Sequence, residues 1–322
     1  MLSLDMICRA QNRLRGLVHR TPLIHSAALS DHLGVKVYLK LELLQKTGSF
    51  KPRGAFNKML SLTPEERKRG VVAVSGGNHA QGVAYAARQL GIAATIVMPA
   101  STPRNYVEAT RGYGAELILT PDIRAAFAEV DRLKAAGRVP VHPFDDPLVA
   151  AGQGTIGLEI LEDLPTVKRV YVSIGGGGLI TGVAMALKSI KADVEIIGVE
   201  TRGADAMSLS LAANRLVELP AITSIARTLG APKVCDFTMS HVQRLVKEVR
   251  VVSDAAAATA LFLVVERLKY LIEPSASCCL AAAEEQRDQF KPDDHIVLLF
   301  CGGNVSVEDL SSFWHRFAAT KT

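Results

Sequence analysis

The 322-residue sequence has few aromatic residues and no long run of hydrophobic or like-charged residues. Aromatic residues make up 5% of the chain, with one tryptophan, which disfavours a surface that stacks nucleic-acid bases. The 37 basic and 32 acidic residues give a net charge of +5 without a run of five like charges, so no nucleic-acid-binding tail is expected. The apolar stretches fall short of the ~20 residues that span a bilayer. We expect a soluble protein without nucleic-acid or membrane partners.

Cysteine is also sparse, and its spacing matches neither a metal site nor a disulfide framework. The five cysteines form no CxxC pair, and an odd number in a chain of this length indicates reduced thiols. The N-terminal segment carries an acid at Asp5 and lacks the apolar core of a signal peptide. Both features predict a cytoplasmic protein. The cysteines are Cys8, Cys235, Cys278, Cys279 and Cys301.

Short β-branched runs alternate with longer helical stretches along most of the chain. This alternation predicts mostly parallel sheets with helices on both faces. The length exceeds a single core of roughly 100 to 200 residues, which predicts two lobes. Strands are expected at residues 35–40, 70–75, 93–98, 116–119, 169–174, 194–199 and 295–300. Helices are expected at residues 80–90, 122–136, 179–190 and 253–271, the last with Ser253 as N-cap.

Three of the predicted strands end in glycine-rich segments. These are SGGNH at 75–79, GGGG at 175–178 and CGGN at 301–304. In open parallel sheets the ligand binds at the carboxyl ends of the strands. The sequence therefore predicts one site that is assembled from segments far apart in the chain.

The four glycines at 175–178 precede a predicted helix that starts near Leu179. Glycines let the backbone approach a ligand closely, and free N–H groups at a helix N-terminus attract an anion. An ordinary tight turn is the simpler interpretation, although four glycines cost more chain entropy than a turn requires. A dinucleotide site is the other alternative, because Gly182 and Glu200 loosely match its spacing. The third glycine of GxGxxG is missing, so this motif alone does not decide between them.

Lys51 lies in a short segment of small residues, TGSFKPRGA at 47–55. A solvated surface lysine is the default interpretation of any single lysine. The glycine-flanked context and the apolar helix that follows favour a functional lysine instead.

Together these segments resemble the pyridoxal-phosphate-dependent threonine/serine dehydratase family, which includes serine racemase. The resemblance runs from about Thr21 to Asn304 and therefore covers almost the whole chain. The motifs occur in the family's order, and their joint match is highly specific. They are SFKPRGA at 49–55, SGGNHAQG at 75–82, AGQGT at 151–155, GGGG at 175–178, EPS at 273–275 and CGGN at 301–304.

The resemblance implies a fold-type II enzyme, like the tryptophan synthase β subunit. Each of its two α/β lobes is an open, mostly parallel twisted sheet flanked by helices, and the cofactor lies between them. The implied boundaries are residues 1–67 and 146–322 for a large cofactor-binding domain and 68–145 for a small mobile domain. The chain ends soon after the last motif, so we expect a short form without a regulatory domain. A homodimer or homotetramer is the expected assembly.

The resemblance also assigns residues to pyridoxal 5'-phosphate. Lys51 is expected to bind the cofactor aldehyde covalently and then, once freed by the substrate, to remove the α-proton. Asn78 is expected to hydrogen-bond the ring hydroxyl, and Cys301 is expected to face the pyridine nitrogen, where many relatives carry serine. A buried inert thiol is the alternative interpretation of this cysteine. The phosphate is expected at the backbone of Gly175, Gly176, Gly177, Gly178 and Leu179.

The substrate carboxylate is expected at Ser75 and at the backbone of Gly77 to His79, with the His79 imidazole in a structural role. Two positions favour elimination over racemisation. Gly76 stands where racemases of this family carry an acid–base serine, so no side chain exchanges a proton there. Phe144 stands where racemases tend to have asparagine, and is typical of dehydratases.

The cation site of some relatives is incomplete in this sequence. Those relatives use a glutamate, a carbonyl four residues later and an aspartate six residues later. Glu200 and Ala204 match the pattern, but Ala206 replaces the aspartate, although Asp205 is adjacent. We therefore expect no tightly bound metal.

The leading hypothesis is a lyase that deaminates L-threonine or L-serine by β-elimination of water, which yields a 2-oxo acid and ammonia. Within the same fold, the alternatives are a serine racemase or a dehydratase for hydroxyaspartate, phenylserine or a hydroxyectoine-pathway substrate. From other classes, a nicotinamide dehydrogenase and a non-catalytic ligand-binding relative remain open. The sequence does not identify the side chain of the substrate.

Overall fold

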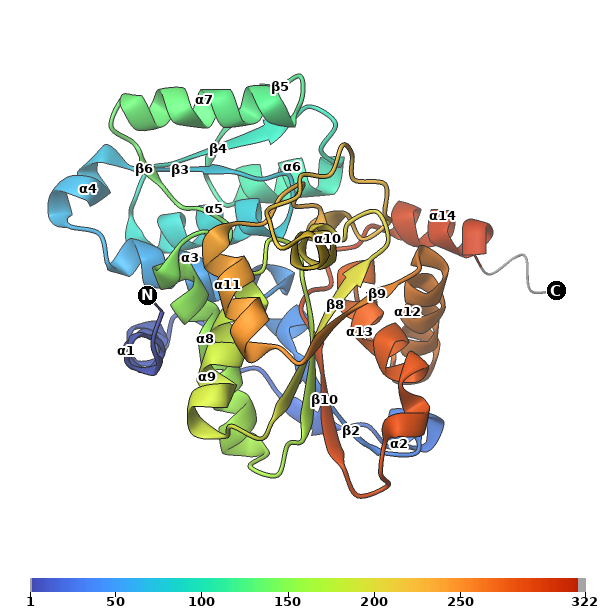
Figure 1. Cartoon of the computed structure of the whole chain (residues 1–322). Coiled ribbons are helices and arrows are strands. Elements are labelled where there is room, and N and C mark those ends of the chain that lie inside the picture. The colour runs from blue at the N-terminus through green and yellow to red at the C-terminus, as the bar shows by residue number, and fades with distance from the viewer. Residues whose placement is uncertain (1, 318–322) are drawn as a thin grey trace.

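The computed structural model describes residues 2–317 and contains two β-sheets with helices packed against them (Figure 1). In the larger sheet every neighbouring pair of strands is parallel except the first, which is an antiparallel edge pair. Its six strands, in sheet order, are β1 (Leu23–His25), β2 (Lys36–Leu41), β10 (His295–Phe300), β7 (Arg169–Ser173), β8 (Glu195–Thr201) and β9 (Glu248–Val252).

The smaller sheet is parallel throughout. Its strands lie between residues 71 and 140, within the small domain predicted at 68–145, and the domain boundaries themselves stay a prediction. In sheet order the strands are β5 (Glu116–Thr120), β4 (Ala94–Pro99), β3 (Val71–Val74) and β6 (Val139–Pro140).

Helices cover both faces of the larger sheet, with α8 and α9 on one side and α12 and α13 on the other (Figure 1). None of the helices within residues 2–317 is long and apolar enough to cross a bilayer. The helices outside the smaller sheet are α1 (Leu4–Leu14), α2 (Ala27–Leu33), α8 (Pro147–Asp163), α9 (Gly178–Ile190), α10 (Ala206–Ala213), α11 (Asp236–Leu245), α12 (Asp254–Leu268), α13 (Pro274–Glu285) and α14 (Val307–Phe317).

Five helices lie before or around the smaller sheet, and four short 3₁₀ turns complete the described elements. The helices are α3 (Lys51–Leu60), α4 (Pro64–Arg69), α5 (Asn78–Leu90), α6 (Arg104–Gly112) and α7 (Ile123–Ala135). The 3₁₀ turns are η1 (Glu42–Leu44), η2 (Lys46–Gly48), η3 (Arg227–Leu229) and η4 (Arg287–Gln289).

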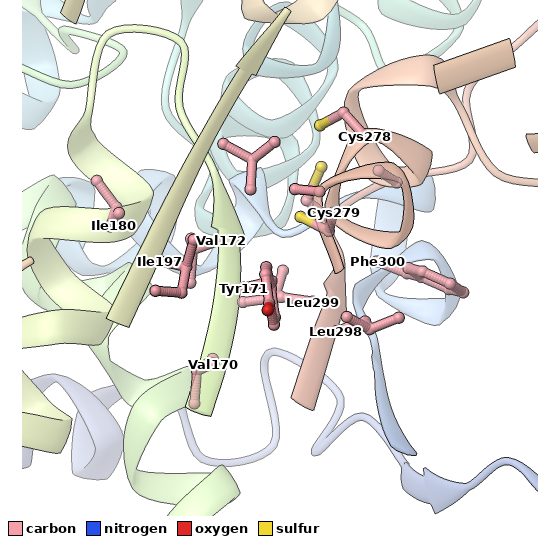
Figure 2. Packing of buried hydrophobic residues seen from close by; sticks show 14 of the residues in the cluster. Val170, Tyr171, Val172, Ile180, Ile197, Cys278, Cys279, Leu298, Leu299 and Phe300 are labelled. Carbon is pink, nitrogen blue, oxygen red and sulfur yellow. The ribbon is translucent and has the colours of Figure 1, made fainter. Parts of the chain in front are cut away.

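The largest apolar core lies on both faces of the larger sheet. Figure 2 shows side chains of β7, β8 and β10 between Ile180 of α9 and Cys279 of α13. The alternating direction of side chains along these fully covered strands explains why both faces are apolar. All five cysteines of the chain are free thiols.

The predicted fold class is confirmed, and the predicted strands lie within one or two residues of the observed ones. The helix predicted at 253–271 is shorter, because Lys269 adopts a left-handed conformation at φ 61° that ends the helix after Leu268. Ser253 is the N-cap, as predicted, and its side chain accepts a hydrogen bond from Ala256 N. Helix α8 was not predicted from periodicity. All twelve residues from Val149 to Ile160 are buried, so α8 has no polar face to reveal a helical period.

Helices α8 and α9 approach closely enough that only glycine fits between them. A Cβ on Gly182 of α9 would lie 2.1 Å from the carbonyl oxygen of Ala150 and 2.6 Å from the backbone nitrogen of Gly154, both on α8. Backbone atoms cannot yield as the tip of a side chain can. This contact fixes the position of α9, whose first turn lies at the functional site described below.

We predict that Gly182→Ala destabilises the fold by about 1–3 kcal/mol, because the added methyl group forces the two helices apart. Gly112→Ala is the matched control, since a Cβ there meets nothing within 4 Å and the residue lies in helix α6. That substitution is expected to stabilise by up to about 1 kcal/mol. Denaturant unfolding of both variants tests the prediction, and equal stabilities would contradict it.

Candidate active site

Three strand ends and the start of one helix meet at a single cavity of about 50 Å³. The segments that follow β3, β7 and β10 contribute Asn78, the glycines at 175–178 and Cys301 to its lining. Lys51, the first residue of α3, lines the same cavity. The structure therefore brings together the glycine-rich strand ends and the lysine that the sequence singled out.

Residues 175–178, which we call the glycine cradle, join β7 to α9. Gly177 has a left-handed φ of +93°, and a Cβ on Gly176 would lie 2.0 Å from Cδ1 of Phe144. Gly177 caps α9 without a side-chain hydrogen bond, so the first N–H groups of the helix have no side-chain partner at this cap. A cavity of this size at the positive end of a helix suits a phosphate group.

The Lys51 side chain enters the cavity with few polar neighbours. Its Nζ lies 3.4 Å from the carbonyl oxygen of Pro143 and 5.0 Å from the centre of the Phe50 ring. Burial lowers the pKa of Lys51 to about 8, because removal from water disfavours the charged ammonium. A large part of this amine is therefore neutral, and so nucleophilic, near neutral pH.

Asn78, the first residue of α5, is buried with both ends of its amide hydrogen-bonded. Its Nδ2 donates to Oε1 of Glu273 at 2.8 Å, and its Oδ1 accepts from Nδ2 of Asn304 at 2.8 Å. Glu273 also accepts from Ser275, and its Oε2 is buried without a hydrogen-bond partner among the described residues. Burial raises the pKa of this carboxyl group.

Cys301 follows β10 and lies at the base of the cavity. Ser173 Oγ donates to its sulfur at 3.4 Å, and Ser275 Oγ lies 3.8 Å from it. Burial raises the pKa of the Cys301 thiol, so it stays protonated at neutral pH. The group can exchange a hydrogen bond with a ligand but provides no fixed negative charge.

A larger cleft of about 580 Å³ shares Lys51, Asn78 and Phe144 with the small cavity. All five residues predicted to contact the substrate line this cleft. They are Ser75, Gly76, Gly77, His79 and Phe144.

The His79 imidazole has the structural surroundings that were expected. Its Nε2 lies 2.8 Å from the carbonyl oxygen of Val141. Burial and the nearby charge of Lys51 lower the pKa of His79 to about 3, so the ring is neutral. Phe144 lies with its ring against the glycine cradle and edge-on to His142.

Comparison with known proteins identifies the family. Residues 14–302 match the family described as pyridoxal-phosphate dependent enzyme. The chain is 44% identical over 309 residues to the L-threonine ammonia-lyase of Thermotoga maritima, which covers 95% of this chain and 77% of that protein. It is similar to maize serine racemase, with a TM-score of 0.92 at 37% identity over 99% and 98% of the two chains. A threonine deaminase from T.th. gives a TM-score of 0.89 at 38% identity over 94% and 99%.

The chain belongs to the pyridoxal-phosphate-dependent enzymes. This confirms the predicted family, the predicted fold and the predicted cofactor. It also favours the phosphate interpretation of the glycine cradle over the dinucleotide one.

The residues present fit this cofactor. The glycine cradle offers backbone N–H groups in a space that a Cβ on Gly176 or Gly178 would enter. Lys51 offers a low-pKa amine, and Asn78 and Cys301 offer polar groups on the walls of the same cavity. When bound, pyridoxal phosphate withdraws electrons from the α-carbon of an attached amino acid.

Sequence reasoning missed several polar residues of the site. Glu273 belongs to a motif that the sequence displayed, but nothing in its spacing showed that it contacts Asn78. Thr228 and Thr102 lie on loops without a recognisable motif, and both line the large cleft. Thr102 is notable because its Oγ1 lies 2.6 Å from the position that a Cβ on Gly76 would take.

The incomplete cation site has a different structural role here. The two oxygens of Glu200 accept hydrogen bonds from the backbone N–H groups of Met207 and Ser208, at 2.9 and 2.8 Å. Glu200 therefore stabilises the N-terminus of α10. Within residues 2–317, no group of three or more His, Cys, Asp or Glu side chains is placed to hold a metal ion.

We predict that the apoprotein binds pyridoxal phosphate covalently at a rate that rises about tenfold per pH unit up to pH 8 and then levels off. Only the neutral amine reacts, and the lowered pKa makes Lys51 neutral above about pH 8, whereas an exposed lysine needs a pH above about 10. Stopped-flow absorbance from pH 6.5 to 10.5 measures the rate, with peptide mass mapping to verify Lys51. A midpoint near pH 10 would show that burial does not activate this lysine.

Proposed function

We propose that this chain is an ammonia-lyase that removes water from L-threonine or L-serine by β-elimination and releases a 2-oxo acid and ammonia. The observation that carries the proposal is that the Lys51 amine, the glycine cradle and the 75–79 loop face connected cavities. The names of two relatives support the same reaction, since one is an L-threonine ammonia-lyase and another a threonine deaminase. The net reaction balances because the water lost in elimination is regained when the enamine product hydrolyses.

In this proposal Lys51 first holds the cofactor and then acts as the base that removes the α-proton. A base must be neutral to accept a proton, and the lowered pKa of Lys51 provides the neutral form near pH 8. Asn78 and Cys301 are proposed to hold the cofactor ring, and the glycine cradle with the Leu179 N–H its phosphate. The buried Cys301 thiol leaves the ring nitrogen without a charged partner.

The substrate carboxylate is proposed to bind at the 75–79 loop. Helix α5 begins at Asn78, and its N-cap, Gly77, makes no side-chain hydrogen bond, so the N–H groups of the first turn attract an anion. Ser75 lies beside them, and its Oγ accepts a hydrogen bond from the backbone of Gly77. The His79 ring is not proposed to transfer protons, because its pKa near 3 keeps it neutral.

A serine racemase is the second candidate, and the similarity to maize serine racemase at a TM-score of 0.92 favours it. Racemisation needs a proton donor on the face of the α-carbon opposite Lys51, within about 3 Å of it. Gly76 has no side chain to donate that proton. The Thr102 hydroxyl, however, occupies the space where such a side chain would lie.

Three further expectations belong to this proposal. Residues 68–145 form a small domain that moves against the rest of the chain, the protein is cytoplasmic, and it assembles as a homodimer or homotetramer. Light scattering after size-exclusion chromatography measures the assembly directly.

We predict that wild-type holoenzyme releases 2-oxo acid from L-threonine and L-serine faster than from 3-hydroxyaspartate or phenylserine. Lys51→Ala is expected to lower turnover at least about a thousandfold, because it removes the base and the covalent link to the cofactor. The exposed Lys36→Ala serves as the control. Borohydride reduction followed by mass mapping is expected to place the cofactor on Lys51. Undiminished turnover by Lys51→Ala would refute the assignment, and preference for another substrate would refute the proposed specificity.

We predict that elimination exceeds racemisation at least about tenfold, because neither Gly76 nor the backbone provides a strong enough acid. The D-isomer and the 2-oxo acid are measured together from L-serine. Because a side chain at position 76 meets Thr102, the racemising variant should be Gly76→Ser combined with Thr102→Ala. Thr102→Ala alone tests whether that hydroxyl supplies any residual racemisation. Faster accumulation of D-serine than of 2-oxo acid by the wild type would contradict the prediction.

A further inference from the structure

The amide of Asn78 is held on both sides by buried side chains that have no role in the proposed chemistry. Glu273 accepts from its Nδ2 and Asn304 donates to its Oδ1, each at 2.8 Å. The three residues come from the start of α5, the N-cap of α13 and the segment after β10. Residues 78, 273 and 304 are therefore brought together only by the tertiary fold.

Groups that can only accept hydrogen bonds fix the direction of both contacts. The Nδ2 of Asn304 also donates to the main-chain carbonyl of Thr47 at 2.7 Å, so this side of the Asn304 amide must be the donor. Oε1 of Glu273 accepts from both Asn78 and Ser275, so any proton on this carboxyl group lies on Oε2. The Asn78 amide can therefore satisfy both neighbours in only one of its two flipped orientations.

The two holding residues are themselves immobilised. A Cβ on Gly302 would lie 2.6 Å from Oε1 of Glu273, and a Cβ on Gly48 would lie 2.6 Å from Oδ1 of Asn304. The Tyr106 hydroxyl donates to the main-chain carbonyl of Asn304 at 2.5 Å, which adds a contact from helix α6. Little room remains in which either side chain could rotate.

We propose that Glu273 and Asn304 are positioning residues that hold the Asn78 amide in the one orientation that binds the cofactor ring. This inference rests on the proposed role of Asn78. One N–H of Nδ2 is occupied by Glu273, which leaves the other for the ring hydroxyl. Without the two flanking groups the amide can rotate by 180° and present its oxygen at the same place, where it would repel a deprotonated ring oxygen.

The test uses two nearly isosteric substitutions, Asn304→Asp and Glu273→Gln, and their combination. Asn304→Asp replaces the donor to Asn78 by an acceptor, and Glu273→Gln supplies a donor on the other side. The double variant therefore favours the flipped amide without changing the net charge of the pair. Melting temperature of the apoprotein and the Kd for pyridoxal phosphate, from fluorescence titration, are measured for each.

Each single variant is expected to weaken cofactor binding at least about tenfold and to lower the melting temperature by about 5 °C. The double variant is expected to lose less than the sum of the two melting-temperature losses, because the flipped amide satisfies both new neighbours. Its cofactor affinity is expected to stay at least about tenfold below wild type. Asn57→Asp is the matched control, since Asn57 is buried and held between Arg13 and the Leu148 carbonyl, outside the site.

Three results would overturn the inference. Cofactor affinity within twofold of wild type in both single variants would show that neither residue positions Asn78. Recovery of affinity together with stability in the double variant would show that the contacts are merely structural. Wild-type affinity in Asn78→Ala would overturn both the inference and the proposed role of Asn78, whereas weak binding by Asn78→Ala with normal binding by Asn304→Asp would overturn the inference alone.

Discussion

A buried group of four charges holds the helix that carries Lys51. The guanidinium of Arg53, two residues after Lys51, binds Glu42 through Nε and Nη2 at 2.9 and 2.8 Å and Glu159 through Nη1 at 2.6 Å. Lys40 contacts the other oxygen of Glu159 at 2.6 Å, so two positive and two negative charges balance. Removing one partner of such a buried pair costs about 3–5 kcal/mol, because an uncompensated charge remains. This group joins β2, η1, α3 and α8 and so fixes where α3 begins.

Glycine contacts bring the same helices close enough for those charges to meet. A Cβ on Gly152 of α8 would lie 2.4 Å from the carbonyl oxygen of Arg53, and a Cβ on Gly54 of α3 would lie 2.4 Å from Nε2 of Gln153. On its other side α8 meets α9 at Gly182. The position of Lys51 and the position of the glycine cradle are therefore linked through one buried helix, α8. The AGQGT motif is part of this packing, and none of its residues lines the cavities that contain Lys51.

The site combines groups that are neutral or nearly neutral because they are buried. Burial lowers the pKa values of Lys51 and His79 and raises those of Cys301 and Glu273. Such a site leaves the helix N-termini of α5 and α9 as its main sources of positive potential. An amino-acid carboxylate and a cofactor phosphate are the two anions that these helix ends can hold.

The sequence by itself determined the fold class, the family and the residues that carry the chemistry. Strand–helix alternation and glycines at strand ends are local patterns, and the local backbone physics of glycine and of helix N-termini makes them readable without a structure. Lys51, Asn78 and the glycine cradle could be selected because each lies in a motif that joins a secondary-structure element to a loop. The roles assigned to these residues stay predictions until the variants are made.

Only the tertiary structure decided which side chains support those residues. Glu273 and Asn304 are 195 and 226 positions from Asn78 in the sequence, and no periodicity relates them. Thr102 fills the space beside Gly76 because β4 and β3 are neighbours in a parallel sheet, which is a long-range pairing. Helix α8 escaped prediction for the same reason, since tertiary packing buries it on all sides and removes the amphipathic pattern. Contacts of this kind depend on how distant segments pack, and a single sequence does not encode that packing in any local signal.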